Sequence, residues 1–138
     1  MKRSQAPIYV KCFDLTLWLL ERSDGFSGSA SALFLRDRLQ HQALETLELL
    51  SQALQFRGQR LERLERANAL VMALRIGLRL AEARKLLEPR QLRYAMEQLD
   101  GVGNMLGGWL RSESPVRDAT FDRVLDHEMN HETSPRPG

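Results

Sequence analysis

The segment His127-Glu128-Met129-Asn130-His131 has the H-E-x-x-H spacing of a zinc-protease helix. In such a helix the two histidines lie one turn apart and bind zinc, and the glutamate acts as a general base. A catalytic zinc also needs a third protein ligand and a walled cleft, whereas this segment lies in an acidic stretch ending in Ser-Pro-Arg-Pro-Gly. We therefore interpret the match as chance and expect no metal site and no metallopeptidase activity.

A single cysteine and a glycine-rich segment are the other features that could indicate chemistry. Cys12 has no histidine near it in the sequence, so we expect a buried structural thiol and not a nucleophile. The glycines of residues 101–107 lack the G-x-G-x-x-G spacing and follow no predicted strand, which excludes a dinucleotide site. We predict a protein that is not an enzyme and binds no cofactor. Its lone cysteine fits a reducing cytoplasm.

Arginine supplies 17 of the 20 cations, and its guanidinium is suited to bidentate contacts with phosphate or carboxylate groups. Residues 1–112 contain 17 cations and 12 anions, whereas residues 113–138 contain three cations and six anions. The stretch 57–93 holds ten cations and four anions, so it is a candidate polyanion-binding surface. The alternative is a solvated face of mixed Arg and Glu. The candidate nucleic-acid contacts are Arg57, Arg60, Arg63, Arg66, Arg84, Lys85, Arg90 and Arg93.

Apolar periodicity and helix-breaking residues predict four helices, at about residues 8–22, 31–56, 59–87 and 89–111. The first carries Phe13, Leu17, Leu20 and the neighbouring Trp18 on its apolar face. A Ser/Gly-rich loop, Gly58 and Glu88-Pro89 separate the helices, and such short connections make antiparallel neighbours. We therefore expect an all-α, up-down four-helix bundle over residues 1–112 and an acidic, largely flexible tail over 113–138. No apolar run approaches the ~20 residues that cross a bilayer, so no membrane partner is expected.

The third predicted helix is apolar on two sides. One side can face the bundle, so the other needs a second subunit, and we expect a homo-oligomer. A helical wheel places Leu64, Ala67, Val71, Leu74 and Leu78 on one side and Ala69, Ile76, Leu80 and Leu87 on the other.

Two charged and two small residues add to the predicted subunit interface. Arg75 and Arg79 lie between the apolar sides, where they either pair with carboxylates such as Glu45, Glu48 or Glu82 or line a wet channel. Gly103 and Gly107 either leave a strip where another backbone approaches closely or mark a weak helix end. The predicted interface residues are Ile76, Leu80, Arg75, Arg79, Gly103 and Gly107.

Several short segments share their order and spacing with segments of a known family. The most specific are Trp18-Leu19-Leu20-Glu21 and Leu106-Gly107-Gly108-Trp109, with Arg36-Asp37-Arg38-Leu39 and Leu78-Arg79-Leu80-Ala81 between them. In roughly residues 9–112 the chain resembles the accessory variability determinant proteins of diversity-generating retroelements. It also resembles the wider group of four-helix proteins encoded in intervening sequences of bacterial large-subunit rRNA genes.

The resemblance implies a four-helix protomer that forms a pentameric barrel with a basic surface and has no catalytic activity. Such proteins bind a retroelement reverse transcriptase and RNA or DNA, and support mutagenic copying of a template RNA. The alternative is a helical interaction protein encoded in an rRNA intervening sequence, of unknown partner. Because few aromatics are available to stack on bases, we expect structured or duplex nucleic acid to bind at least as well as single strands.

Overall fold

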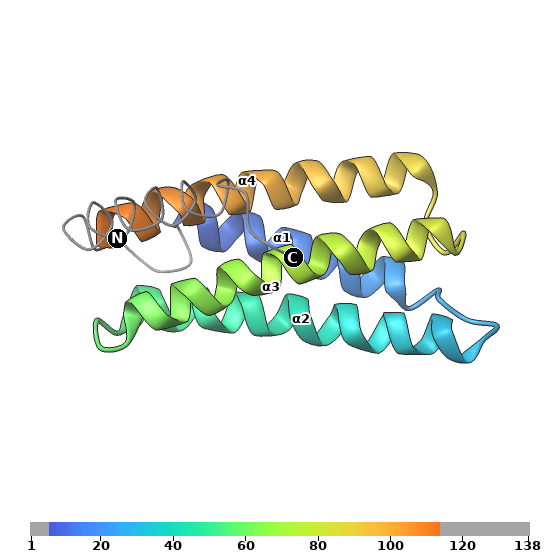
Figure 1. Cartoon of the computed structure of the whole chain (residues 1–138), viewed down its shortest axis with the longest axis horizontal. Coiled ribbons are helices and arrows are strands. Elements are labelled where there is room, and N and C mark those ends of the chain that lie inside the picture. The colour runs from blue at the N-terminus through green and yellow to red at the C-terminus, as the bar shows by residue number, and fades with distance from the viewer. Residues whose placement is uncertain (1–5, 114–138) are drawn as a thin grey trace, which may run out of the picture.

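The chain folds into four antiparallel helices that form one bundle (Figure 1). The computed structural model describes residues 6–113, which contain α1 (Pro7–Ser23), α2 (Ala30–Gln55), α3 (Arg60–Ala83) and α4 (Pro89–Glu113). Each helix packs against the next one in the chain, and α4 packs against α1, which closes the bundle. The predicted up-down four-helix bundle is confirmed within these residues. The H-E-x-x-H segment and the rest of the predicted tail from residue 114 lie outside the described residues.

Helices α2 and α4 begin where the sequence supplies side-chain partners for free backbone N–H groups. Ser29 precedes α2, and its Oγ accepts a hydrogen bond of 3.1 Å from the N–H of Ala32. Pro89 opens α4, where the Gln91 side chain accepts a 2.9 Å hydrogen bond from the N–H of Glu88. These starts agree with the predicted ones to within a residue.

The C-terminal end of α3 differs from the prediction, because the helix ends at Ala83 and not at Leu87. Lys85 adopts a left-handed backbone with φ 64°, and the N–H of Leu86 donates to the Ala81 carbonyl at 2.8 Å, as in a Schellman motif. Leu87 follows this turn and is buried, so its predicted place on the outer side of α3 was wrong. The turn was missed because glycine usually occupies this left-handed position and here lysine does.

Leucine side chains from all four helices fill the core. The inner side predicted for α3 is confirmed, since Leu64, Leu74 and Leu78 are completely buried there. The largest fully buried side chains are Leu19, Leu39, Leu50, Leu64, Leu74, Leu78, Leu99, Leu106 and Val102.

Helix α1 buries a different side from the one predicted. Ile8, Cys12, Leu15 and Leu19 face the core, whereas Phe13, Leu17 and Leu20 are exposed. Both sets repeat at helical spacing, so periodicity alone could not choose between them. The apolar face predicted for α1 is therefore real but points outward.

The side chain of Leu39 on α2 packs directly against Gly77 on α3. A Cβ atom placed on Gly77 would lie 2.8 Å from Cδ2 of Leu39, which is completely buried. Leu39 cannot move aside without displacing other core side chains, because protein interiors are close-packed. Gly77 therefore sets how closely these two helices pack.

We expect the Gly77→Ala variant to be about 1–3 kcal/mol less stable than the matched Gly108→Ala variant, because only the first overpacks the core. Both substitutions gain the same helix propensity, about 1 kcal/mol. A Cβ on Gly108 would meet only Nη2 of Arg111, at 3.9 Å. Urea unfolding of both variants measures the difference, and equal stabilities would show that α2 and α3 have room for a methyl group.

Candidate functional site

The predicted nucleic-acid contacts divide between the two ends of the bundle. Arg57, Arg60, Arg63 and Arg66 surround the turn between α2 and α3, which we call the α2–α3 basic end. The second group surrounds the turn between α3 and α4 at the opposite end of the bundle (Figure 1). This α3–α4 basic end consists of Arg84, Lys85, Arg90 and Arg93.

At the α2–α3 basic end, two arginines stabilise the turn itself. Nε of Arg60 donates a 2.6 Å hydrogen bond to the Ala53 carbonyl, and its Nη1 lies 3.5 Å from Oε1 of Glu113. Nη1 of Arg63 donates to the carbonyl of Gly58. The last carbonyls of a helix have no partner within the helix and attract cations. Arg60 therefore satisfies a carbonyl at the end of α2 and Arg63 bonds to the turn that follows, which occupies part of their hydrogen-bonding capacity.

The other two arginines of the α2–α3 basic end differ in their partners. Nε of Arg66 forms a 2.7 Å ion pair with Oε2 of Glu45 on α2. Arg57 is exposed and forms no ion pair among the described residues. Among these four arginines, Arg57 is the one whose guanidinium forms no hydrogen bond or ion pair with another described residue.

The α3–α4 basic end has more cations without a described carboxylate partner than the α2–α3 basic end. Lys85 and Arg93 are exposed, and neither pairs with a carboxylate in the part of the chain that the structure describes. Arg84 donates a 3.1 Å hydrogen bond to the hydroxyl of Ser31, a neutral partner. Three cations near one turn, none of them paired with a carboxylate of residues 6–113, produce a local positive potential.

Among residues 6–113, Arg90 is the cation of this basic end that forms an ion pair. Its Nε lies 2.9 Å from Oε2 of Glu88, and the two side chains are 77% and 61% exposed. Such a surface pair contributes ~0–1 kcal/mol, so a phosphate could replace the carboxylate. Arg22, at the end of α1, lines the same surface hollow as Arg90. Sequence reasoning missed Arg22 because it lies outside the basic stretch 57–93.

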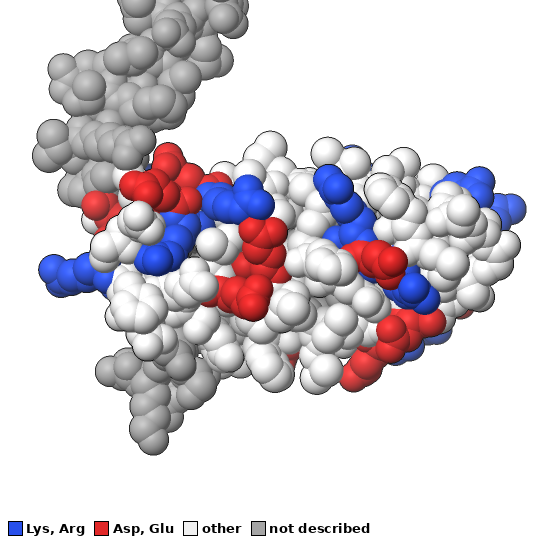
Figure 2. Space-filling view, turned by 90° about the horizontal axis from the view of Figure 1, so that it is seen from below, with Lys and Arg blue, Asp and Glu red and all other residues white. Residues whose placement is uncertain are grey.

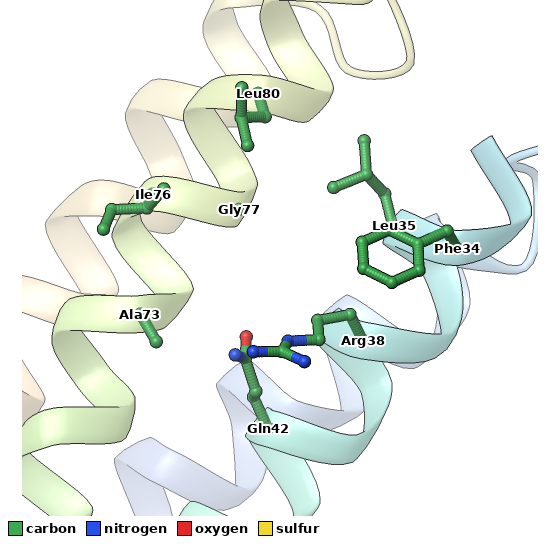
Figure 3. Close-up of a pocket in the computed structure, with 8 residues that line it drawn as sticks. All are labelled: Phe34, Leu35, Arg38, Gln42, Ala73, Ile76, Gly77 and Leu80. Atoms are coloured by element: carbon green, nitrogen blue, oxygen red, sulfur yellow. The ribbon is translucent and has the colours of Figure 1, made fainter. Parts of the chain in front are cut away.

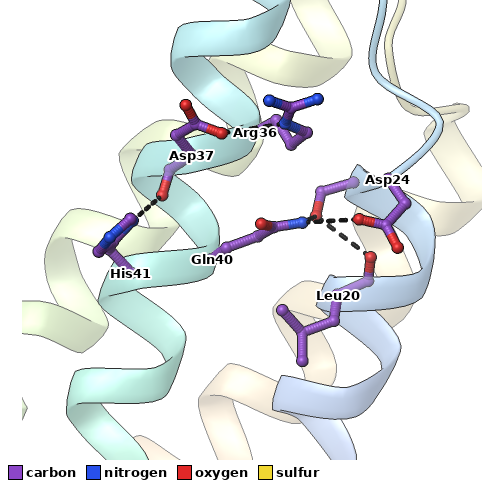
Figure 4. A network of polar contacts seen from close by, with 7 residues as sticks. Leu20, Asp24, Arg36, Asp37, Gln40 and His41 are labelled. Carbon is purple, nitrogen blue, oxygen red and sulfur yellow. Dashed lines mark hydrogen bonds and ion pairs between the residues drawn. The ribbon is translucent and has the colours of Figure 1, made fainter.

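A polar network joins the end of α1 to α2 beside this basic end (Figure 4). Nε2 of Gln40 donates to Oγ of Ser23 at 2.9 Å and to Oδ1 of Asp24 at 3.0 Å. Phe26, in the loop that follows, is buried in the core. Side-chain bonds and an apolar anchor therefore fix the predicted loop. On the outer side of α2, His41 is exposed and its Nδ1 contacts the Asp37 carbonyl at 2.7 Å.

The outer side of α3 presents apolar side chains to solvent, as the sequence predicted. Ile76 is 64% exposed and Leu80 is 51% exposed. Together with Phe34 of α2 they border an open groove of about 320 Å³ between the two helices (Figure 3). Its full lining consists of Phe34, Leu35, Arg38, Gln42, Ala73, Ile76, Gly77 and Leu80.

The remaining predicted interface residues lie elsewhere on α3 and α4. Nη1 of Arg75 forms a 2.6 Å ion pair with Oδ1 of Asp100 in the same chain, and not with Glu45, Glu48 or Glu82. A Cβ on Gly103 would lie 3.5 Å from Nη2 of the same arginine, so the guanidinium packs beside this glycine. Arg79 is exposed, and Gly107 lies beside Arg111.

A second apolar patch covers the outer side of α1 and the adjacent side of α2. Val10, Phe13, Leu17 and Leu20 repeat at intervals of three and four residues on α1, and Leu44 of α2 is also exposed. Figure 2, which views the bundle from the side where α2 lies, shows charged side chains separated by broad uncharged areas. The bundle thus exposes apolar side chains on two flanks of α2.

Cys12 is buried, as predicted, and is not placed for chemistry. Burial raises the pKa of its thiol from 9.0 to about 11, and the hydrogen bond from Thr16 opposes this shift. The described residues contain no group of three or more His, Cys, Asp or Glu side chains that could hold a metal ion. The thiol therefore remains protonated at neutral pH, the less reactive form.

No protein-family model matches this chain, and neither the curated proteins nor the solved structures contain a significant match. Among the described helices, none is both long enough and apolar enough to span a bilayer.

We expect Cys12 to react with a thiol reagent such as DTNB at pH 8 only after the protein unfolds. The raised pKa also makes stability depend on pH. Below pH 9.0 the thiol is protonated in both the folded and the unfolded protein. Between pH 9.0 and about 11 only the thiol of the unfolded protein ionises. The free energy of unfolding therefore falls by roughly 1.4 kcal/mol per pH unit in this range. Urea unfolding at pH 8 and pH 10.5 measures this loss, and a Cys12→Ala control should lack that part of it. Rapid labelling of the folded protein would contradict the burial.

Proposed function

We propose that this protein is a non-catalytic, nucleic-acid-binding accessory subunit of a retroelement reverse transcriptase, acting as a homo-oligomeric ring. The observation that carries the nucleic-acid part is the α3–α4 basic end, where Arg84, Lys85 and Arg93 lie near one turn without a carboxylate partner among the described residues. The reverse transcriptase as partner rests on the resemblance of the Trp18–Glu21 and Leu106–Trp109 segments to the accessory variability determinant proteins.

The proposed mechanism is electrostatic. Lysine and arginine side chains that contact phosphates release counterions, which favours binding without regard to sequence. In a ring, the same basic end would repeat once per protomer, so a modest local charge would become an extended positive surface.

The groove between α2 and α3 supports the proposed assembly. Ile76, Leu80 and Phe34 are each more than half exposed there, and burial against a second copy would remove this apolar surface from water. Oε1 of Gln42, in the same groove, is buried without a hydrogen-bond donor from the described residues. A donor from a neighbouring subunit would satisfy this atom.

The exposed apolar patch on α1 and α2 favours a second candidate, a helical interaction protein encoded in an rRNA intervening sequence. Phe13, Leu17 and Leu20 would then contact a protein partner, and the basic ends would serve solubility. The gene neighbourhood distinguishes the two candidates. A reverse-transcriptase gene beside this one favours the accessory subunit, whereas a position inside an rRNA gene favours the alternative.

Replacing Arg84, Lys85 and Arg93 with glutamine should weaken binding to a duplex RNA probe and flatten its salt dependence. Each lost phosphate contact reduces the slope of log K against log salt by ~0.9 on duplex, so three contacts per site correspond to roughly 2–3 units. Fluorescence anisotropy between ~50 and ~200 mM salt measures both quantities. The matched control is a variant in which Arg60, Arg63 and Arg66 are all replaced with glutamine. We expect this control to change the salt slope less than the first variant does and to unfold at a lower urea concentration. If neither variant changes affinity or slope, the nucleic-acid proposal is wrong.

The oligomer should depend on the outer side of α3. Light scattering on the wild-type protein should give a mass several times 15.8 kDa. The Ile76→Asp/Leu80→Asp double variant should sediment as a helical monomer, because two carboxylates would be desolvated at the interface. Phe56→Asp, at a half-exposed position near the end of the bundle, is the control and should keep the wild-type mass. A monomeric wild-type protein would exclude the ring.

A further inference from the structure

A surface hollow of about 260 Å³ lies on the seam between α1 and α4, near the α3–α4 basic end. Its lining contains two aromatic and two cationic side chains, together with one amide. These residues are Trp18 and Arg22 of α1 and Arg90, Gln91 and Tyr94 of α4. They come from the first and the last described helix, so the hollow exists only where the bundle closes.

The two aromatic rings that line this hollow contact each other. The ring centroids of Trp18 and Tyr94 are 5.1 Å apart, with 46° between the ring planes. Trp18 is half-buried and packs against the core, whereas Tyr94 is 41% exposed. The half-buried tryptophan packs against the tyrosine, whose ring still has apolar surface open to a flat ligand.

Both cations of the hollow can bind an anion. The guanidinium of Arg22 lies 5.9 Å from the centroid of the Trp18 ring and has no carboxylate partner among residues 6–113. Within the described part of the chain, Arg90 pairs only with the exposed Glu88, which a phosphate can replace at small cost. Phosphate oxygens match the fork of a guanidinium, so the two arginines favour a ligand with a phosphate group.

The side-chain Nε2 group of Gln91 donates no hydrogen bond to another described residue. Its Oε1 already accepts the hydrogen bond from the N–H of Glu88 at 2.9 Å. This bond orients the side chain and leaves the Nε2 hydrogens as donors. Carbonyl oxygens and ring nitrogens on the edge of a nucleobase accept such donors.

We infer that this hollow binds one unpaired nucleotide of an RNA or DNA strand, with the base against Tyr94 and a phosphate near Arg22 and Arg90. The inference rests on the proposed function, because it gives the proposed nucleic-acid subunit a site for a strand end or a duplex–single-strand junction. Stacking on an aromatic ring next to arginines is how proteins bind unpaired bases. A nucleotide site differs from the sequence-based expectation that duplex binds at least as well as single strands because aromatic residues are few. One aromatic pair per protomer is enough to bind one unpaired nucleotide.

The test uses a hairpin RNA with a single-stranded 3′ extension and the same hairpin with a blunt end. The wild-type protein should bind the extended hairpin roughly tenfold more tightly, the effect of about one stacked base. Tyr94→Leu should reduce this preference to near one while leaving the affinity for the blunt hairpin unchanged. Tyr94→Phe keeps the ring and should behave as the wild type. Circular dichroism melting checks that each variant is folded.

A matched control exists at the other end of the bundle. The guanidinium of Arg63 also lies 5.9 Å from an aromatic ring, that of Phe56, but this ring has no second aromatic beside it in the described structure. Arg63 is also bonded to the Gly58 carbonyl. The Phe56→Leu variant should therefore keep the preference for the extended hairpin.

The outcomes of this test distinguish failure of the nucleotide site from failure of the proposed function. Equal binding of both hairpins by the wild type, or a preference that Tyr94→Leu retains, would overturn the nucleotide site and leave the proposed function standing. Failure to bind either hairpin at low salt would overturn both. Trp18 fluorescence, measured in a Trp109→Phe background, should be quenched by the extended hairpin. Quenching by a proline-rich peptide and not by RNA would assign the hollow to a peptide ligand instead.

Discussion

Apolar residues occur on two sides of α3, and a bundle of four helices can bury only one of them. The inner side, with Leu64, Leu74 and Leu78, is completely buried and holds the protomer together. The outer side remains in contact with water at Ile76 and Leu80. Gly77, against which Leu39 of α2 packs, also lines the groove between the outer surfaces of α2 and α3. The same helix thus defines both the core and the surface that we propose for assembly.

The arginines have two physical roles, which the sequence could not separate. At the α2–α3 basic end, Arg60 and Arg63 bind backbone carbonyls and Arg66 pairs with Glu45, so these cations stabilise the fold. At the α3–α4 basic end, the charges of Lys85 and Arg93 are uncompensated by the described carboxylates. The net charge of +2 hides this asymmetry, because it counts both roles equally.

Much of the fold could be predicted because local signals mark it. Ser29, Gly58 and Pro89 marked the connections, and apolar spacing predicted the buried side of α3. The end of α3 was missed because Lys85 occupies a position where glycine is the usual signal. The buried side of α1 was missed because the neighbouring helices, and not the sequence of α1, decide which apolar side is covered.

The candidate sites depend more strongly on distant parts of the chain. The basic stretch was visible as a count of charges, but which guanidiniums are already bonded depends on carbonyls and carboxylates from other helices. The hollow beside Trp18 combines side chains from α1 and α4, and no spacing within either helix indicates that they meet. Sequence patterns therefore predicted the elements well and the composition of a site that spans two of them poorly.

The closure of α1 against α4 has a consequence for the order of folding. The contacts between these helices are remote in sequence, as in the 3.2 Å hydrogen bond from Lys11 to Gln98, whereas the α2–α3 pair is joined by a short turn. Closing a long loop costs more conformational entropy than closing a short one. During synthesis, the α2–α3 hairpin can therefore form while α4 is still in the ribosome. Until α4 arrives, Trp18 lacks its tyrosine, so a nascent chain has no complete aromatic hollow.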